Sequence, residues 1–124
     1  MFLAIDPSDD NKISYYLFDD QKEISLTKQA KSSDFLSVLV DFLSEQNIEL
    51  QEILGIVVVV GQGRFTSTRI ATVIGNLFGF DLKIPLLSLE KFSLKNKKQI
   101  IEQLENTPKN KYISARYSGE PNIN

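Results

Sequence analysis

Apolar and polar positions follow two kinds of pattern along this chain. Short apolar runs separated by polar turn residues predict a meander of three antiparallel strands, at 2–5, 13–18 and 23–27. The β-branched run at 56–60 does not alternate, which is typical of a strand covered on both faces of a sheet. Two glycines follow this run, and a helix capped by Thr66 or Ser67 is expected directly after them. Strand, glycine turn and helix together predict the α/β class.

The helix that follows the glycine turn, as far as Gly79, has two different faces. One arc is apolar and is expected to cover the sheet: Ile70, Ala71, Val73, Ile74, Leu77 and Phe78. The opposite arc carries one charge, Arg69, and otherwise small or polar residues: Thr68, Thr72, Gly75, Asn76 and Gly79. Glycine inside a helix costs about 1 kcal/mol relative to alanine, and close approach of a helix from another chain would offset that cost. We therefore predict that this arc is a partner interface; the alternative is that another part of the same chain covers it.

An earlier helix, predicted from Asp34 to Gln46 with Ser32 or Ser33 as its cap, also has apolar surface to spare. Its apolar residues sweep roughly 200°, wider than the stripe of about 100° that packing on one sheet requires. They are Phe35, Leu36, Val38, Leu39, Val40, Phe42 and Leu43. We assign Phe35 and Val38 to the same predicted interface.

The last third of the chain is more polar. A strand is predicted at 82–86, with Pro85 indicating an edge position, and a helix is predicted from Leu89 after a Ser88 cap. Ile100, Ile101 and Leu104 form a helical stripe within the lysine-rich stretch 93–110. Residues 1–110 are therefore expected to form one domain. Residues 111–124 are expected to form a short strand at 112–117 and a flexible tail.

Composition excludes several classes of function. The 124 residues suffice for one domain with its own core, and the net charge of −2 gives no electrostatic reason to expect direct binding of nucleic acid or an anionic membrane. The chain has neither Cys nor His, which removes thiolate ligands, the usual general base and the commonest transition-metal ligand. No signal peptide or membrane-spanning run is apparent, so a cytoplasmic location is expected.

The order of elements, three strands followed by helix, strand, helix and strand, is that of the ribonuclease-H-like fold, a mixed five-stranded sheet with helices packed on it. Four blocks resemble the TsaB (YeaZ) family in order and spacing. FLAIDPS at 2–8 resembles the family's "ILAIDTS", and GQGRFTSTRIA at 61–71 resembles its "GPGSFTGLRIG". PLLSLEKF at 85–92 and Ala115-Arg116 with Glu120 resemble "vSSLEALA" and "DARrgEvY". The resemblance covers about residues 1–120 and the first of the family's two lobes.

The resemblance implies a function in tRNA modification. TsaB proteins are non-catalytic partners of TsaD-type enzymes, which install threonylcarbamoyl on adenosine (t6A) in tRNA, and the two pair through the first two helices of the first lobe. By resemblance, this chain is expected to be a scaffold subunit that binds a TsaD-like protein and other proteins of the t6A pathway, and to form a homodimer when alone.

A rival hypothesis is a small nucleotide- or Mg²⁺-dependent enzyme on the same fold. It would use Asp6 with the loop Gly61, Gly63 and Arg64, at a helix N-terminus that attracts anions. That loop lacks the third glycine of a dinucleotide fingerprint and the Gly-Lys-Ser/Thr of a P-loop. We therefore expect no catalytic residue, cofactor or metal, and give Asp6, Thr66 and Arg69 structural roles. Asp6 is expected to reach the helix N-terminus or the Thr66 and Ser67 hydroxyls.

Overall fold

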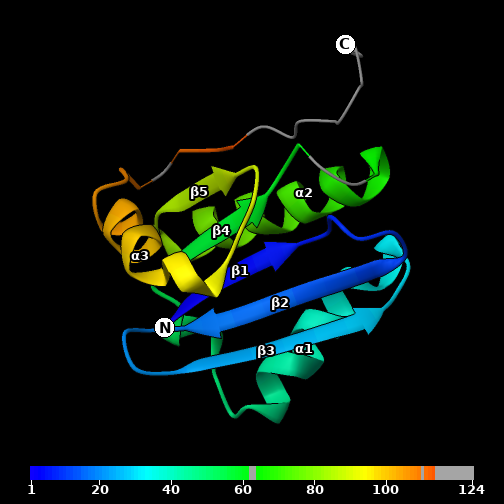
Figure 1. Ribbon diagram of the computed structural model, residues 1–124, viewed down its shortest axis with the longest axis horizontal. Helices are drawn as coiled ribbons and strands as arrows, with labels where there is room; N and C mark the ends of the chain where they lie inside the picture. The colour runs from blue at the N-terminus through cyan, green and yellow to red at the C-terminus, as the bar shows by residue number, and fades with distance from the viewer. Residues whose placement is uncertain (62–63, 110, 114–124) are drawn as a thin grey trace.

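A computed structural model describes residues 1–61, 64–109 and 111–113 of the chain. Its strands form one mixed sheet in the order β3-β2-β1-β4-β5 (Figure 1). β1 pairs antiparallel with β2, and β2 with β3, whereas β4 runs parallel to both β1 and β5. The strands are β1 (Phe2–Asp6), β2 (Lys12–Phe18), β3 (Glu23–Gln29), β4 (Gly55–Val59) and β5 (Leu86–Leu89). The predicted class, the meander and the five-stranded mixed sheet are confirmed.

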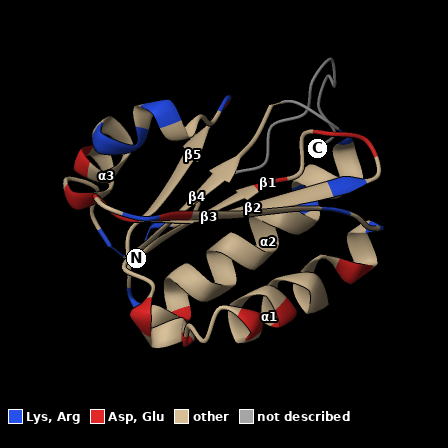
Figure 2. Ribbon diagram, turned by 60° about the horizontal axis from the view of Figure 1, so that its bottom comes forward, with Lys and Arg blue, Asp and Glu red and all other residues tan. Residues whose placement is uncertain are grey.

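Helices cover both faces of this sheet. α1 and α2 lie side by side on one face, and α3 lies on the other (Figure 2). The α-helices are α1 (Phe35–Glu45), α2 (Phe65–Leu82) and α3 (Lys97–Glu105). Short 3-10 turns occur at Ser32–Asp34, Leu50–Glu52 and Leu94–Asn96. Each face of the sheet therefore has its own layer of apolar packing.

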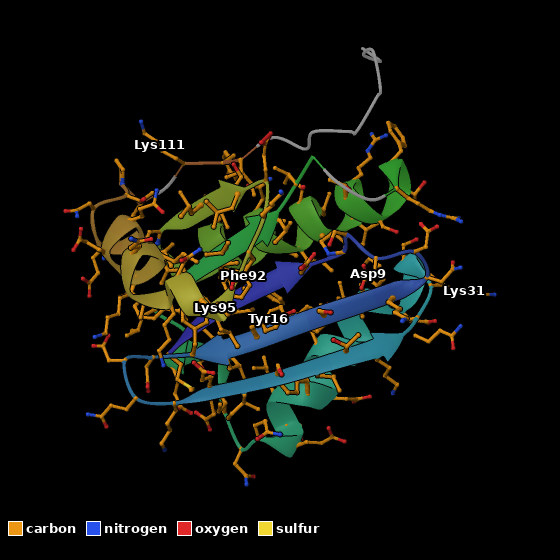
Figure 3. All side chains as sticks on the ribbon, in the orientation of Figure 1. Asp9, Tyr16, Lys31, Phe92, Lys95 and Lys111 are labelled. Atoms are coloured by element: carbon orange, nitrogen blue, oxygen red, sulfur yellow. The ribbon has the colours of Figure 1, made fainter. Side chains whose placement is uncertain are left out.

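The central strands are buried on both faces, as their unbroken apolar sequences predict. Ile56 and Val58 of β4 belong to the core beneath α1 and α2, whereas Val57 belongs to the core beneath α3. Tyr16 of β2 and Phe92 lie close together on the α3 side, with ring centroids 4.8 Å apart (Figure 3). The predicted stripe of α3 is also confirmed, because Ile100, Ile101 and Leu104 are buried.

The largest differences from the sequence prediction lie between the end of α2 and the start of α3. α2 continues to Leu82 and ends in a left-handed cap at Lys83 (φ 57°), where Ile84 N–H donates to the Gly79 carbonyl at 3.1 Å. β5 therefore begins at Leu86, after Pro85, although it does occupy the predicted edge position. Ser88 lies in β5 and does not cap a helix. The predicted helix from Leu89 is wrong, because α3 begins only at Lys97.

The segment after α3 packs on α2. Lys111–Ile113 is not a strand, and the rest of the strand predicted at 112–117, like the tail at 118–124, lies outside the described residues. Ile113 packs against the core beneath α1 and α2. Over the described part of the chain, no helix combines the length and apolarity needed to cross a membrane.

Candidate functional site

The carboxyl ends of β1 and β4 lie side by side because these strands are parallel neighbours. The acidic turn after β1 and the glycine loop after β4 therefore meet at one edge of the sheet, where ligands bind in many α/β folds. Asp9 marks this turn in Figure 3. Gly61 has φ +86°, a left-handed conformation that favours glycine. Gln62 and Gly63 lie outside the described residues.

The Asp6 side chain makes its hydrogen bonds within the turn that follows β1. Its Oδ1 accepts hydrogen bonds from the Ser8 backbone N–H at 3.0 Å and from the Ser8 hydroxyl at 2.5 Å. The expected contact with the N-terminus of α2 is replaced by this local turn. Thr66 is exposed in the first turn of α2, and among the described residues the hydrogen bonds of the Asp6 side chain come from Ser8 and not from the Thr66 or Ser67 hydroxyl. The structural role of Asp6 is to close the turn after β1.

Two arginines flank the N-terminus of α2. Arg64 occupies the N-cap position, and its Nε donates to Asp10 Oδ1 at 3.0 Å in an exposed ion pair. Neither Thr66 nor Ser67 is the cap, because α2 begins at Phe65 and places both in its first turn. The Arg69 guanidinium lies 6.0 Å from the centre of the Phe65 ring, at the range of a cation–π contact. Among the described residues, no three carboxylates gather as a metal site would require.

The small-residue arc of α2 faces the chain's own sheet. A Cβ added at Gly75 would lie 2.5 Å from Val58 Cγ2, and one added at Gly79 would lie 3.4 Å from Leu86 Cδ2. The prediction that these glycines permit close approach of another chain is therefore wrong. They permit close approach of α2 to β4 and β5, which is the alternative left open above.

The other residues of the predicted interface are also engaged inside the chain. Thr68 and Thr72 are buried, and the Thr72 hydroxyl donates to the Thr68 carbonyl at 2.8 Å. Phe35 and Val38 of α1 are buried in the core. Asn76 is half-buried and binds the backbone of Ile113. Thr68, Thr72, Phe35 and Val38 therefore do not form an outward surface, whereas Asn76 keeps part of its side chain exposed.

The outward face of α2 is instead apolar. Val73, Leu77 and Phe80 are 54%, 57% and 59% exposed. On α1, Leu36 and Val40 are 44% and 51% exposed, so the predicted apolar surplus of α1 is confirmed. We call these five residues the apolar face. α2 carries only two charged residues, Arg69 and Asp81, and it appears almost uncharged in Figure 2.

The sequence pattern misses this face for a simple reason. It places Val73 and Leu77 on the arc that should cover the sheet, and Phe80 lies just beyond the predicted helix end. Both arcs of α2 follow the helical period, so the sequence pattern alone does not choose between them. Val58 projects bulky methyl groups toward α2, so small residues have to lie over this strand. Val73, Leu77 and Phe80 are then left to face outward, while Ile74 is buried in the core.

No family model and no curated protein matches the sequence. Among solved structures, YeaZ from Pseudomonas aeruginosa matches with a TM-score of 0.66 and 25% identity, over 82% of this chain and 49% of that one. The chain resembles the TsaB (YeaZ) family. A second structure, described as an uncharacterized protein with similarity to peptidase YEAZ from Pseudomonas aeruginosa, matches equally well, over 48% of its length. The chain thus spans about half the length of these YeaZ-like proteins and has a ribonuclease-H-like fold.

Proposed function

We propose that this chain is a non-catalytic pairing subunit that acts with a TsaD-type enzyme in t6A modification of tRNA in the cytoplasm. The observation that carries the proposal is the apolar face, in which α2 exposes three large side chains in a row. The likeness to YeaZ supports the choice of pathway. In the absence of that partner, a second copy of the chain is expected to cover the same face.

The exposed side chains give this face a physical reason to be covered. Complete burial of a Val, Leu or Phe side chain is worth roughly 1.5–3 kcal/mol, and Val73, Leu77 and Phe80 retain more than half of their exposure. Contiguous exposed apolar surface is typical of protein–protein contact sites. The spacing of three and four residues puts the three side chains on one side of α2, where a helix of the partner can contact all of them.

The acidic turn supports the non-catalytic part of the proposal. Asp6 accepts two hydrogen bonds from Ser8, and Asp10 pairs with Arg64, so both carboxylates serve the local structure. A nucleotide-binding enzyme needs backbone N–H groups and cationic groups aimed at phosphate, and Pro7 offers no N–H at this turn. Tight one-to-one binding of Mg²⁺–ATP in a calorimetric titration would contradict this part.

The pairing is tested with Leu77→Glu. The substitution would place a charge without a counter-ion in the buried contact, an effect of about 3–5 kcal/mol. We expect affinity for the TsaD-type protein of the same organism, measured by calorimetry, to fall more than tenfold while circular dichroism stays unchanged. Gln103→Glu is the matched control, since it adds the same charge at an exposed position of α3 on the opposite face of the sheet. Unchanged affinity for Leu77→Glu would overturn the pairing surface.

A further inference from the structure

The segment Lys111–Ile113 is hydrogen-bonded to α2 through the Asn76 side chain. We call this segment the strap; it follows α3 and is drawn in orange-red in Figure 1. Asn76 Nδ2 donates to the Ile113 carbonyl at 3.0 Å, and Ile113 N–H donates to Asn76 Oδ1 at 2.8 Å. The amide thus satisfies both backbone groups of one residue, which fixes the position and direction of the strap along the helix.

The fastening brings Tyr112 onto Phe80. Their rings are stacked with centroids 6.1 Å apart and an interplanar angle of 21°. Both side chains nevertheless remain more than half exposed, so the pair forms part of the outer surface. A hollow of about 270 Å³ lies beside them, lined by Val73, Asn76, Leu77, Phe80 and Tyr112. Three of these residues belong to the apolar face, and the strap contributes one wall.

We propose that this hollow is the anchor pocket of the pairing surface, and that it takes one uncharged apolar side chain of Leu, Met or Phe type from the TsaD-type partner. The inference rests on the proposed function and assigns the partner's contacting chemistry. No lining residue carries a formal charge, so a charged group entering the hollow would find no counter-ion there. The Asn76 amide is already paired with the strap, so an apolar guest leaves its hydrogen bonds intact.

The size and position of the hollow support this occupant. Sites for small ligands and cofactors measure about 300–1,000 Å³ and enclose their ligand. This hollow is smaller, lies open on the surface and is continuous with the apolar face, which suits a side chain presented by another protein. Aromatic residues at the centre of protein interfaces often dominate their affinity. Tyr112 and Phe80 are such a pair, and Asn76 acts as the positioning residue that holds one of them in place.

The contribution of Tyr112 to the hollow is tested with Tyr112→Ala. The measured quantity is the affinity for the TsaD-type protein of the same organism, determined by calorimetry. We expect affinity to fall about fivefold or more, as for an interface residue of this kind. Tyr112→Phe keeps the ring and should bind like the parent. Lys111→Ala, in the same strap but outside the hollow, should also bind like the parent. Unchanged affinity for Tyr112→Ala overturns the pocket. Tighter binding also overturns it, because the strap would then be a cover that competes with the partner.

The positioning role is tested with Asn76→Ala and a double-mutant cycle. Because both residues act through the strap, Asn76→Ala should lower affinity about as much as Tyr112→Ala, and the double variant should be little worse than either one. Effects that simply multiply would overturn the role of Asn76. A nuclear Overhauser effect between the Phe80 and Tyr112 rings, lost in Asn76→Ala, gives a readout that does not depend on the partner.

The outcomes separate this inference from the proposed function. If Leu77→Glu abolishes pairing and Tyr112→Ala does not weaken it, the apolar face is supported as the pairing surface and the anchor pocket is contradicted. If neither substitution changes the affinity for the TsaD-type protein, the proposed pairing function is contradicted together with the anchor pocket. If Tyr112→Ala weakens only self-association, measured by sedimentation, the TsaD-type occupant is overturned.

Discussion

Gly75 of α2 lies directly over Val58 of β4, where a Cβ on the helix would come within 2.5 Å of a valine methyl group. This contact sets the orientation of α2. The helix can approach the sheet here only with Gly75 inward, and Val73, Leu77 and Phe80 are consequently left on the outside, while Ile74 is buried in the core. This helix–strand contact therefore helps to determine which residues of α2 lie on the surface.

The first prediction concerns this contact. Gly75→Ala would push against the β-branched Val58, which is buried and cannot swing away, at a cost of about 1–3 kcal/mol for overpacking. The gain in helix propensity of about 1 kcal/mol offsets only part of that cost. We expect the free energy of unfolding, from urea denaturation, to fall. Gly79→Ala is the matched control: its Cβ would sit at an ordinary 3.4 Å from Leu86, so that variant should be neutral or more stable. Equal effects at both positions would contradict the assignment.

The second prediction compares the two faces of α2. Thr72→Glu buries a carboxylate against the sheet, where Thr72 is only 6% exposed, and it should destabilise the fold by several kcal/mol. Leu77→Glu places the same charge on the outward face and should change the melting temperature little. Thermal melts followed by circular dichroism distinguish the two. A stable Thr72→Glu variant would mean that α2 is rotated relative to this structure.

The third prediction concerns Tyr15, whose hydroxyl donates to the Phe35 carbonyl at 2.6 Å and links β2 to the start of α1. Burial raises the pKa of this phenol above its ordinary value of about 10. The phenol stays neutral in the folded state at a pH where the unfolded chain already ionises. Its contribution is thus fully present below pH 10 and declines as the pH rises above 10.

The substitution Tyr15→Phe tests both the hydrogen bond to Phe35 and the pH dependence that the phenol causes. Loss of the hydrogen bond should lower the free energy of unfolding at pH 7 by about 0.5–1.5 kcal/mol. Above pH 10, the variant should lose stability less steeply than the parent, because it lacks the ionising group. Denaturation curves at pH 7, 9 and 10.5 would show this, and an equal loss of stability between pH 9 and pH 10.5 in both proteins would refute it.

The fourth prediction concerns the turn after β1. Asp6→Ala removes the acceptor of both Ser8 hydrogen bonds and should destabilise the fold by about 1–2 kcal/mol. Asp6→Asn retains an oxygen acceptor at Oδ1 and should be closer to the parent. The measurement is urea denaturation of both variants at pH 7. If Asp6→Asn is as unstable as Asp6→Ala, the negative charge is the essential property, and a contact with the N-terminus of α2 regains support.

The sequence by itself determined the α/β class, the meander followed by strand–helix units, and the likeness to a known family. Those features depend on local patterns: alternation in the meander, an unbroken β-branched run at 56–60 and a glycine turn with a helix after it. The apolar surplus of α1 was equally readable, because its apolar arc is too wide for one sheet. In each case, the residues that produce the pattern are neighbours in the chain.

Only the tertiary structure decided which side of α2 faces outward and where the last described segment packs. Both arcs of α2 satisfy the helical period, so periodicity alone cannot choose between them. The choice depends on the volume of Val58, which lies in β4 under Gly75, and of Leu86, which lies in β5 under Gly79. Both residues belong to other elements than the helix that they orient. The pairing of Asn76 with Ile113 spans 37 residues and follows no local pattern. Steric fit between distant segments selected the surface that the sequence pattern had assigned to the core.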